Sequence, residues 1–121
     1  MTRPYHFIEF ERRGDVFCVR LSRTQLDELM IYELAGEMRR LVVEDGCRKL
    51  ALSLGPEPPE CLYSIFLAKL ITLQRLLNEH QGELVLCQAP PAVHNIFAAC
   101  GLDQIFRFLP DFDSALAHWT K

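Results

Sequence analysis

Cys61 is the residue best placed for nucleophilic chemistry, because it stands where an apolar helix is expected to begin. The positive end of a helix can lower the pKa of a thiol and so favour the reactive thiolate. Nucleophilic catalysis also needs a base within reach, and the histidines are dispersed, with His94 as the nearest candidate. A thiol enzyme that uses Cys61 and His94 is therefore one hypothesis, but a structural thiol is the interpretation we favour.

Three oxygen-bearing side chains flank Cys61 in the sequence. Ser64 could accept a phosphate, because the dipole and free N–H groups of a helix N-terminus favour an anion, or it could be an ordinary first-turn serine. Glu57 and Glu60 are close enough to hold a cation, but prolines stiffen the backbone between them and no series of oxygen ligands follows. We therefore expect no metal, no cofactor and no catalytic residue, and Ser64 is the candidate for modification.

Length and charge limit what the chain can be. With 121 residues, 50% of them hydrophobic, it can form one compact core, so we expect a single domain over residues 1–121. A formal net charge of −3 gives no field that would gather nucleic acid, which is bound through clustered Lys and Arg. Nucleic acid is therefore not an expected partner.

The N-terminus and the cysteines indicate the compartment. The first ten residues lack the apolar core of a signal peptide, and no apolar run reaches transmembrane length, so we expect no membrane insertion. The five cysteines are widely spaced with no CxxC pair, which argues against a disulfide framework or a zinc site. A cytoplasmic protein with reduced thiols is the expectation.

Hydrophobic periodicity and turn residues predict the elements that must position these groups. In chain order they are strands at 6–10 and 16–21, a helix capped by 22–24 that runs from 26 to Asp45, a strand at 50–54, a proline-rich loop, a helix at 62–80, a strand at 83–87, a helix from Pro90 to Cys100, a strand at 105–108 and a helix from 112 to 119. Strand and helix alternate after an initial hairpin. This order predicts an α/β fold with a mixed, mostly parallel sheet of about five strands and about four helices.

Side-chain orientations follow from the same periodicity. The helix at 62–80 carries an inward stripe that includes Phe66 and Leu70. The helix after Pro90 is expected to bury four apolar residues, namely Val93, Ile96, Phe97 and Cys100, and Gly101 fits a left-handed C-terminal cap. The last helix is expected to bury Phe112, Leu116 and Trp119 behind a cap at Asp111.

Three segments carry a resemblance to a known family: VFCVRL at 16–21, TQLDE at 24–28, and QGELVLCQAPPAVHNIFAACGLDQIFRF at 81–108. In their order and spacing they resemble the STAS domains of bacterial anti-sigma-factor antagonists, over about Phe10 to Trp119. The resemblance implies a STAS-like domain, a fold that agrees with the elements predicted above.

The helix that follows the proline-rich loop departs from the pattern of the phosphorylated members of this family. Such members carry Asp-Ser-Ser-Gly there, and a partner kinase phosphorylates the second serine. Counting back from Gly82 without gaps places these four positions on Tyr63, Ser64, Ile65 and Phe66. Ile65 has no hydroxyl, whereas a register shifted by one residue would make Ser64 the acceptor. The resemblance therefore implies a diverged member that the usual serine phosphorylation does not switch.

The loop and helix start also form the partner-contacting surface in this family. A helix cannot bury every apolar residue at this position, so one or two are expected to be exposed beside the carboxylates. The predicted partner-binding residues are Glu57, Glu60, Tyr63, Ser64, Ile65 and Phe66.

We therefore expect a non-catalytic protein-binding regulator that acts on an anti-sigma factor or a related signalling partner, such as a kinase-fold ATPase. Two alternatives remain open: an accessory subunit of an ABC-type lipid transporter, which would bind the ABC ATPase, and a small thiol enzyme that uses Cys61. A two-fold homodimer through the apolar helix start is a further expectation on the binding side.

Overall fold

The computed structural model describes residues 4–60 and 64–120, which form one five-stranded sheet and four helices. The strands are β1 (Ile8–Arg13), β2 (Val16–Leu21), β3 (Lys49–Ser53), β4 (Glu83–Cys87) and β5 (Arg107–Leu109). The helices are α1 (Glu28–Val43), α2 (Ser64–Glu79), α3 (Pro91–Ala99) and α4 (Phe112–Trp119). The predicted α/β fold with a mixed, mostly parallel sheet is confirmed.

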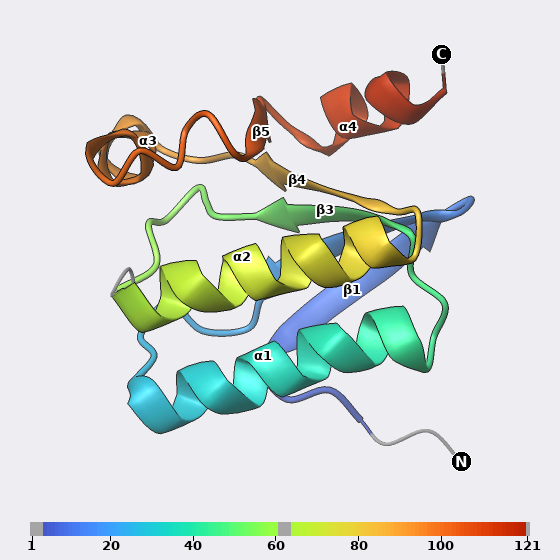
Figure 1. The fold of residues 1–121 in the computed structure, drawn as a ribbon, viewed down its shortest axis with the longest axis horizontal. Helices are drawn as coiled ribbons and strands as arrows, with labels where there is room; N and C mark the ends of the chain where they lie inside the picture. Colours follow the sequence, from blue (N-terminus) through green and yellow to red (C-terminus); the bar gives the residue numbers. More distant parts are fainter. Residues whose placement is uncertain (1–3, 61–63, 121) are drawn as a thin grey trace.

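The strands lie in the sheet in the order of the sequence, β1-β2-β3-β4-β5. β1 pairs with β2 in antiparallel fashion, and the remaining neighbours are parallel. The carboxyl ends of β2 to β5 therefore meet at one edge of the sheet, on the left of Figure 1. We call this the carboxyl edge.

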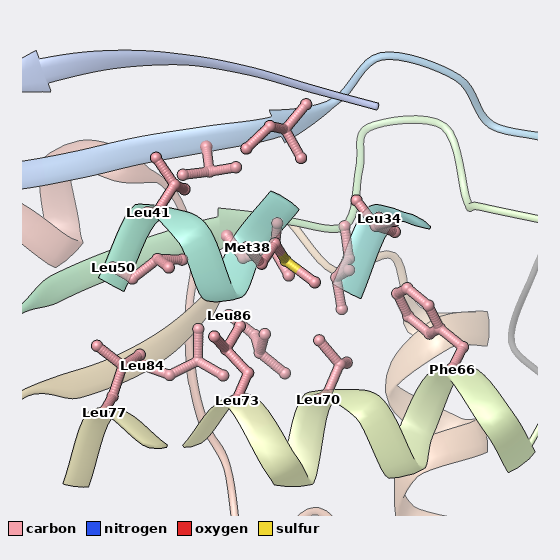
Figure 2. Packing of buried hydrophobic residues seen from close by; sticks show 14 of the residues in the cluster. Leu34, Met38, Leu41, Leu50, Phe66, Leu70, Leu73, Leu77, Leu84 and Leu86 are labelled. Carbon is pink, nitrogen blue, oxygen red and sulfur yellow. The ribbon is translucent and has the colours of Figure 1, made fainter. Parts of the chain in front are cut away.

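One face of the sheet is covered by α1 and α2, which lie side by side (Figure 1). The stripe of α2 at Phe66, Leu70, Leu73 and Leu77 points toward the strands and α1, as Figure 2 shows. Its members belong to one buried cluster with leucines of β3 and β4. Because apolar burial is worth about 25 cal/mol per Å², this layer is the main stabilising element of the fold.

The opposite face carries a second, smaller core under α4. Successive strand residues point to opposite faces, so Cys18 and Cys87 lie on this side, where they pack with Phe112 of α4. The far end of α4 is fastened to the start of β4, since Trp119 Nε1 donates to Glu83 Oε1 at 2.9 Å and His118 Nε2 lies 3.0 Å from the same oxygen.

The first helix begins later than predicted. Asp27 is the N-cap of α1, and its side chain accepts a hydrogen bond of 2.9 Å from Met30 N–H. Residues 22–24 lie in the loop before it, so the predicted cap there is wrong. Leu26, which periodicity assigned to the helix, is buried just ahead of the cap.

Two predictions for the C-terminal half were also wrong. Ile96 is 36% exposed and Cys100 is exposed, because the nine-residue helix α3 reaches the core only through Val93 and Phe97. Gly101 does adopt the left-handed conformation predicted for the cap, with φ of 73°. Phe112 is buried, whereas Leu116 and Trp119 are only partly covered at the rim of the second core.

No helix within the described residues is long and apolar enough to cross a membrane.

The chain before β1 is held against α1 by a buried carboxylate. Glu37, only 7% exposed, accepts hydrogen bonds from the backbone N–H groups of His6 (2.9 Å) and Phe7 (2.8 Å). Farther along the helix, Arg40 lies over the Tyr5 ring, 4.1 Å from its centroid. This segment therefore runs back along α1, away from the carboxyl edge.

Replacing Glu37 with alanine should lower the free energy of unfolding by about 1–3 kcal/mol, because buried backbone donors would lose their acceptor. Urea unfolding followed by circular dichroism measures the change. Glu79→Ala, which removes an exposed carboxylate at the end of α2, is the control and should change stability by less than about 0.5 kcal/mol. Equal stability of the two variants would contradict the role assigned to Glu37.

Candidate functional site

The candidate site lies at the carboxyl edge, where the loop after β3 reaches the start of α2 (Figure 1). Ligands and partners of open parallel sheets are commonly met at this edge, because loops there can change without disturbing the core. The loop, residues 55–60, and the neighbouring loop after β2, residues 22–27, come together here. We call the two loops with the first turn of α2 the loop surface.

The two loops are fastened to each other by backbone pairing. Gln25 and Glu60 form an isolated parallel bridge, and the N–H of Glu60 donates to the carbonyl oxygen of Thr24. Pro59, beside this bridge, is buried. Prolines restrict φ elsewhere in the segment. The loop after β3 is therefore a supported structure, although it carries no regular secondary structure.

Hydrogen bonds and a close backbone contact also join this loop to the end of β4. Ser53 Oγ lies 2.8 Å from the carbonyl oxygen of Gly55 and 2.6 Å from Oε1 of Gln88. Gln88 itself has a left-handed backbone, with φ of 59°. A Cβ atom at Gly55 would overlap the carbonyl oxygen of Gln88. The ends of β3 and β4 are thus in direct backbone contact, and only glycine fits at position 55.

A cavity of about 220 Å³ opens between the two loops. Arg20, Arg23, Ser53 and Glu57 are among the polar residues that line it. The guanidinium group of Arg23 lies 5.5 Å from the centroid of Phe7, and that of Arg20 lies 4.8 Å from the centroid of Phe112. Aromatic rings therefore help to position both cations at the cavity, whose lining also includes the carboxylate of Glu57.

Four of the predicted contact residues lie in described parts of the chain. Glu57, Glu60 and Ser64 are exposed, and Ile65 is half-buried at the start of α2. Neither Glu57 nor Glu60 forms an ion pair within residues 4–60 and 64–120, so both carboxylates are available to a partner. Their exposure is compatible with contact to a partner, and their role as a binding surface stays a prediction.

Phe66 does not belong to this surface, and the expectation of contact by its side chain is corrected. It is 1% exposed and packs in the main core, because residues 66, 70, 73 and 77 form the inward stripe of α2 (Figure 2). Leu67 is also buried. Tyr63 and Cys61 lie outside the described residues, so their predicted roles remain predictions.

His94, the predicted base of a thiol enzyme, packs against an aromatic ring. His94 on α3 lies against Phe108 of β5, with 4.6 Å between ring centroids. Among the described cysteines, burial raises the pKa of Cys18, and it raises the pKa of Cys47 and of Cys87 to about 12. These three thiols are therefore protonated and shielded, which suits packing and not nucleophilic attack.

In the described part of the chain, no three His, Cys, Asp or Glu side chains cluster in a way that could hold a metal ion. Glu57 and Glu60 have no third ligand among these residues. They are therefore surface charges in this structure.

Sequence reasoning missed Arg20, Arg23, Ser53 and Gln88. The arginines are separated by two residues at the end of a strand, and nothing in their local pattern connects them with Glu57. Gln88 takes a left-handed backbone that glycine or asparagine more often signals. Their place in the sequence could have indicated these residues, since all four lie at or beyond the carboxyl ends of predicted parallel strands.

The sequence matches the profile of the STAS domain family over residues 7–115. A relative named an anti-sigma F factor antagonist, from Paenibacillus polymyxa, is 27% identical over 114 residues, covering 94% of this chain and 92% of that protein.

Solved structures show the same fold. A putative anti-sigma factor antagonist from Thermotoga maritima is similar with a TM-score of 0.80 and 17% identity, over 96% of this chain and 97% of that one. An anti-sigma factor antagonist from Mycobacterium paratuberculosis is similar with a TM-score of 0.76 and 24% identity, over 94% and 93% of the two chains. The arrangement of strands and helices is therefore shared across nearly the whole length.

Gly55→Ala should lower the free energy of unfolding by about 1–3 kcal/mol, because the new Cβ must displace the backbone of Gln88 or the loop itself. Thermal and urea unfolding measure the change. Glu57→Ala, in the same loop but exposed, is the matched control and should leave stability almost unchanged. A Gly55→Ala protein as stable as that control would mean that the contact between strand ends is not tight.

Alkylation of a folded Cys61→Ser variant should modify Cys100 first, because it is the exposed cysteine among those described. Cys18, Cys47 and Cys87 should react only after unfolding in urea, since burial excludes the reagent and keeps their thiols protonated. Peptide mass spectrometry after timed iodoacetamide treatment identifies the labelled sites. Rapid labelling of Cys47 or Cys87 in the folded protein would contradict the core assignment.

Proposed function

Because the chain belongs to the STAS domain family, we propose that it is a cytoplasmic protein-binding regulator that antagonises an anti-sigma factor or a related signalling partner. The observation that carries the proposal is the family match over residues 7–115, together with exposed residues on the loop surface at the carboxyl edge. The named function of the Paenibacillus polymyxa relative supports the same class of activity. The protein acts by occupying the surface of its partner, without catalysis.

The supported loops suit this role. Binding costs less free energy when the contacting segment is already ordered, since fewer side-chain and loop conformations are lost. The Gln25–Glu60 bridge and the contact of Gly55 with Gln88 hold the loop after β3 from two sides. The surface can therefore meet a partner with little rearrangement.

The charges of the loop surface determine which partner surfaces are complementary to it. Glu57 and Glu60 are exposed and unpaired within the described residues, so a complementary partner presents basic side chains opposite them. Arg23 at the cavity rim offers a site for one acidic group of the same partner. Such rim charges raise the association rate and fix the orientation of the complex more than they add affinity.

We propose that the usual serine phosphorylation does not switch this protein. The gapless count back from Gly82 places that serine on Ile65 and the family's glycine on Phe66, which is buried. A phosphate would therefore need Ser64, which is exposed at the first residue of α2.

Affinity capture from the native host, with the tagged protein as bait, should recover a kinase-fold protein or another component of a sigma-factor pathway. Recovery of an ABC ATPase with its permease would instead support the transporter alternative. Failure to recover any protein, together with turnover of a small molecule, would overturn the proposal. Mass spectrometry of the bait reports in the same experiment whether Ser64 carries phosphate.

With the partner purified, Glu57→Lys combined with Glu60→Lys should weaken binding about tenfold, mainly by slowing association. Surface plasmon resonance at two salt concentrations measures the rates, and the difference between wild type and variant should shrink at high salt. Glu79→Lys, at the opposite end of α2, is the matched control for a change of charge on the surface. Equal loss of affinity in the control would show that net charge, and not this loop surface, is recognised.

A further inference from the structure

A cavity of about 250 Å³ opens between α1 and α2, the two helices that lie side by side in Figure 1. Every described residue that lines it belongs to one of these helices. Met38 and Leu73 are buried and line its inner side, while Ala35 and Leu76 are half-buried beside them. None of the described lining residues belongs to the loop surface. We call this space the helix cavity.

Gly36 lies exposed at the helix cavity, in the middle of the 16-residue helix α1. Glycine is, after proline, the residue least favourable to a helix interior. Its backbone is not left-handed, and a Cβ at this position would meet no described atom within 4 Å, so neither conformation nor packing requires glycine. A side chain here would instead occupy open space at the cavity. Glycine therefore keeps the helix cavity accessible from solvent.

Two cations and no carboxylate line the helix cavity within the described residues. Lys69, half-buried on α2, holds its ammonium nitrogen 4.8 Å from the centroid of the Tyr32 ring. Arg39 lines the cavity two turns farther along α1, about 10 Å beyond Tyr32 at 1.5 Å per residue. Neither cation forms an ion pair within residues 4–60 and 64–120. In a chain of net charge −3, this local positive charge is complementary to an anion.

We propose that the helix cavity binds a small aliphatic anion, that is, a short hydrocarbon chain that ends in a carboxylate or phosphate group. The anionic group pairs with the ammonium group of Lys69, and the chain lies beside Gly36 and against Met38 and Leu73. Ligand sites are mostly apolar cavities of about 300–1,000 Å³ with a few placed polar groups. At about 250 Å³ the helix cavity is slightly smaller, which restricts the ligand to a short chain.

The anionic group is assigned to Lys69 because this cation is the better ordered of the two. Contact with Tyr32 positions the ammonium group before a ligand arrives, and partial burial reduces the screening of its charge. Arg39 is exposed, so its charge adds a weaker and less directional attraction. The helix cavity lies apart from Glu57 and Glu60, so the inference does not depend on the proposed function.

A series of ligands tests the apolar part of the site by isothermal titration calorimetry. Affinity should rise about fourfold per added methylene from butanoate through hexanoate to octanoate, the factor expected when a methylene group is buried. Octyl phosphate, compared with octanoate, identifies the preferred anionic group. Octanol, which lacks the charge, should bind about three- to fivefold more weakly than the better of the two. Equal affinity for butanoate and octanoate would contradict an apolar site.

Variants test the residues assigned to the site. Lys69→Met should weaken octanoate binding about three- to fivefold and leave octanol binding unchanged, whereas Lys69→Arg should retain octanoate binding. Arg75→Met, which removes an exposed cation of α2 outside the cavity lining, is the matched control and should bind octanoate as wild type does. Gly36→Leu should abolish binding while circular dichroism shows a folded protein, because leucine favours a helix and its Cβ meets open space.

The proposal would be overturned by a wild type that shows no saturable binding of octanoate or octyl phosphate. Equal losses in Lys69→Met and Arg75→Met, or binding that survives Gly36→Leu, would also overturn it. Sedimentation distinguishes a ligand from a second copy of the chain: wild type should remain at 14.0 kDa with and without octanoate. A wild-type dimer that Gly36→Leu dissociates would show that another chain covers the helix cavity, against the proposal.

Discussion

The parallel pairing of β3 with both of its neighbours is the constraint on which the other features depend. Each residue from Lys49 to Ser53 is in register with β2 on one side and with β4 on the other. This register fixes the level at which three strands end, and so brings their loops to one edge. It also makes Leu50 and Leu52 the floor of the main core, while Ala51 faces α4. A shift of one residue would exchange these two sets of side chains between the faces.

Loop structure at the carboxyl edge follows from that register. Because β3 and β4 end together, Gly55 and Gln88 meet through backbone atoms, and a side chain at position 55 has no room. The loop after β3 then turns toward Thr24 and pairs with the loop after β2. The loop surface is therefore shaped by the sheet below it, while its charges at Glu57 and Glu60 can vary without cost to the core. The charges of this surface can therefore change without a change of fold.

Local patterns predicted much of the fold and less of the candidate site. The alternation of strand and helix, the stripe on α2 and the left-handed Gly101 are all local properties, and the structure has each of them. The predicted start of α1 was wrong because several neighbouring residues can cap a helix. The burial of Leu26 just before the helix favours Asp27 as the cap.

The features that could not be predicted depend on residues far apart in the sequence. In the sequence Glu37 resembles any other carboxylate on a helix. Its role depends on the chain near Phe7, whose backbone N–H donates to it in the folded structure. The cavity rim joins Arg23 to Glu57 across two loops. At the start of α2, periodicity alone left open which apolar residues are exposed, and the packing of Phe66 against the core decides it.

The return path of the N-terminal segment along α1 has a consequence for how the domain can be held. α4 likewise runs back from the carboxyl edge to Glu83, so both ends of the described chain emerge at the opposite edge, on the right of Figure 1. A tether or fused domain at either end would therefore stand behind the domain, with the loops directed outward. Attachment through either end is compatible with end-on display, as on a scaffold or a sensor chip.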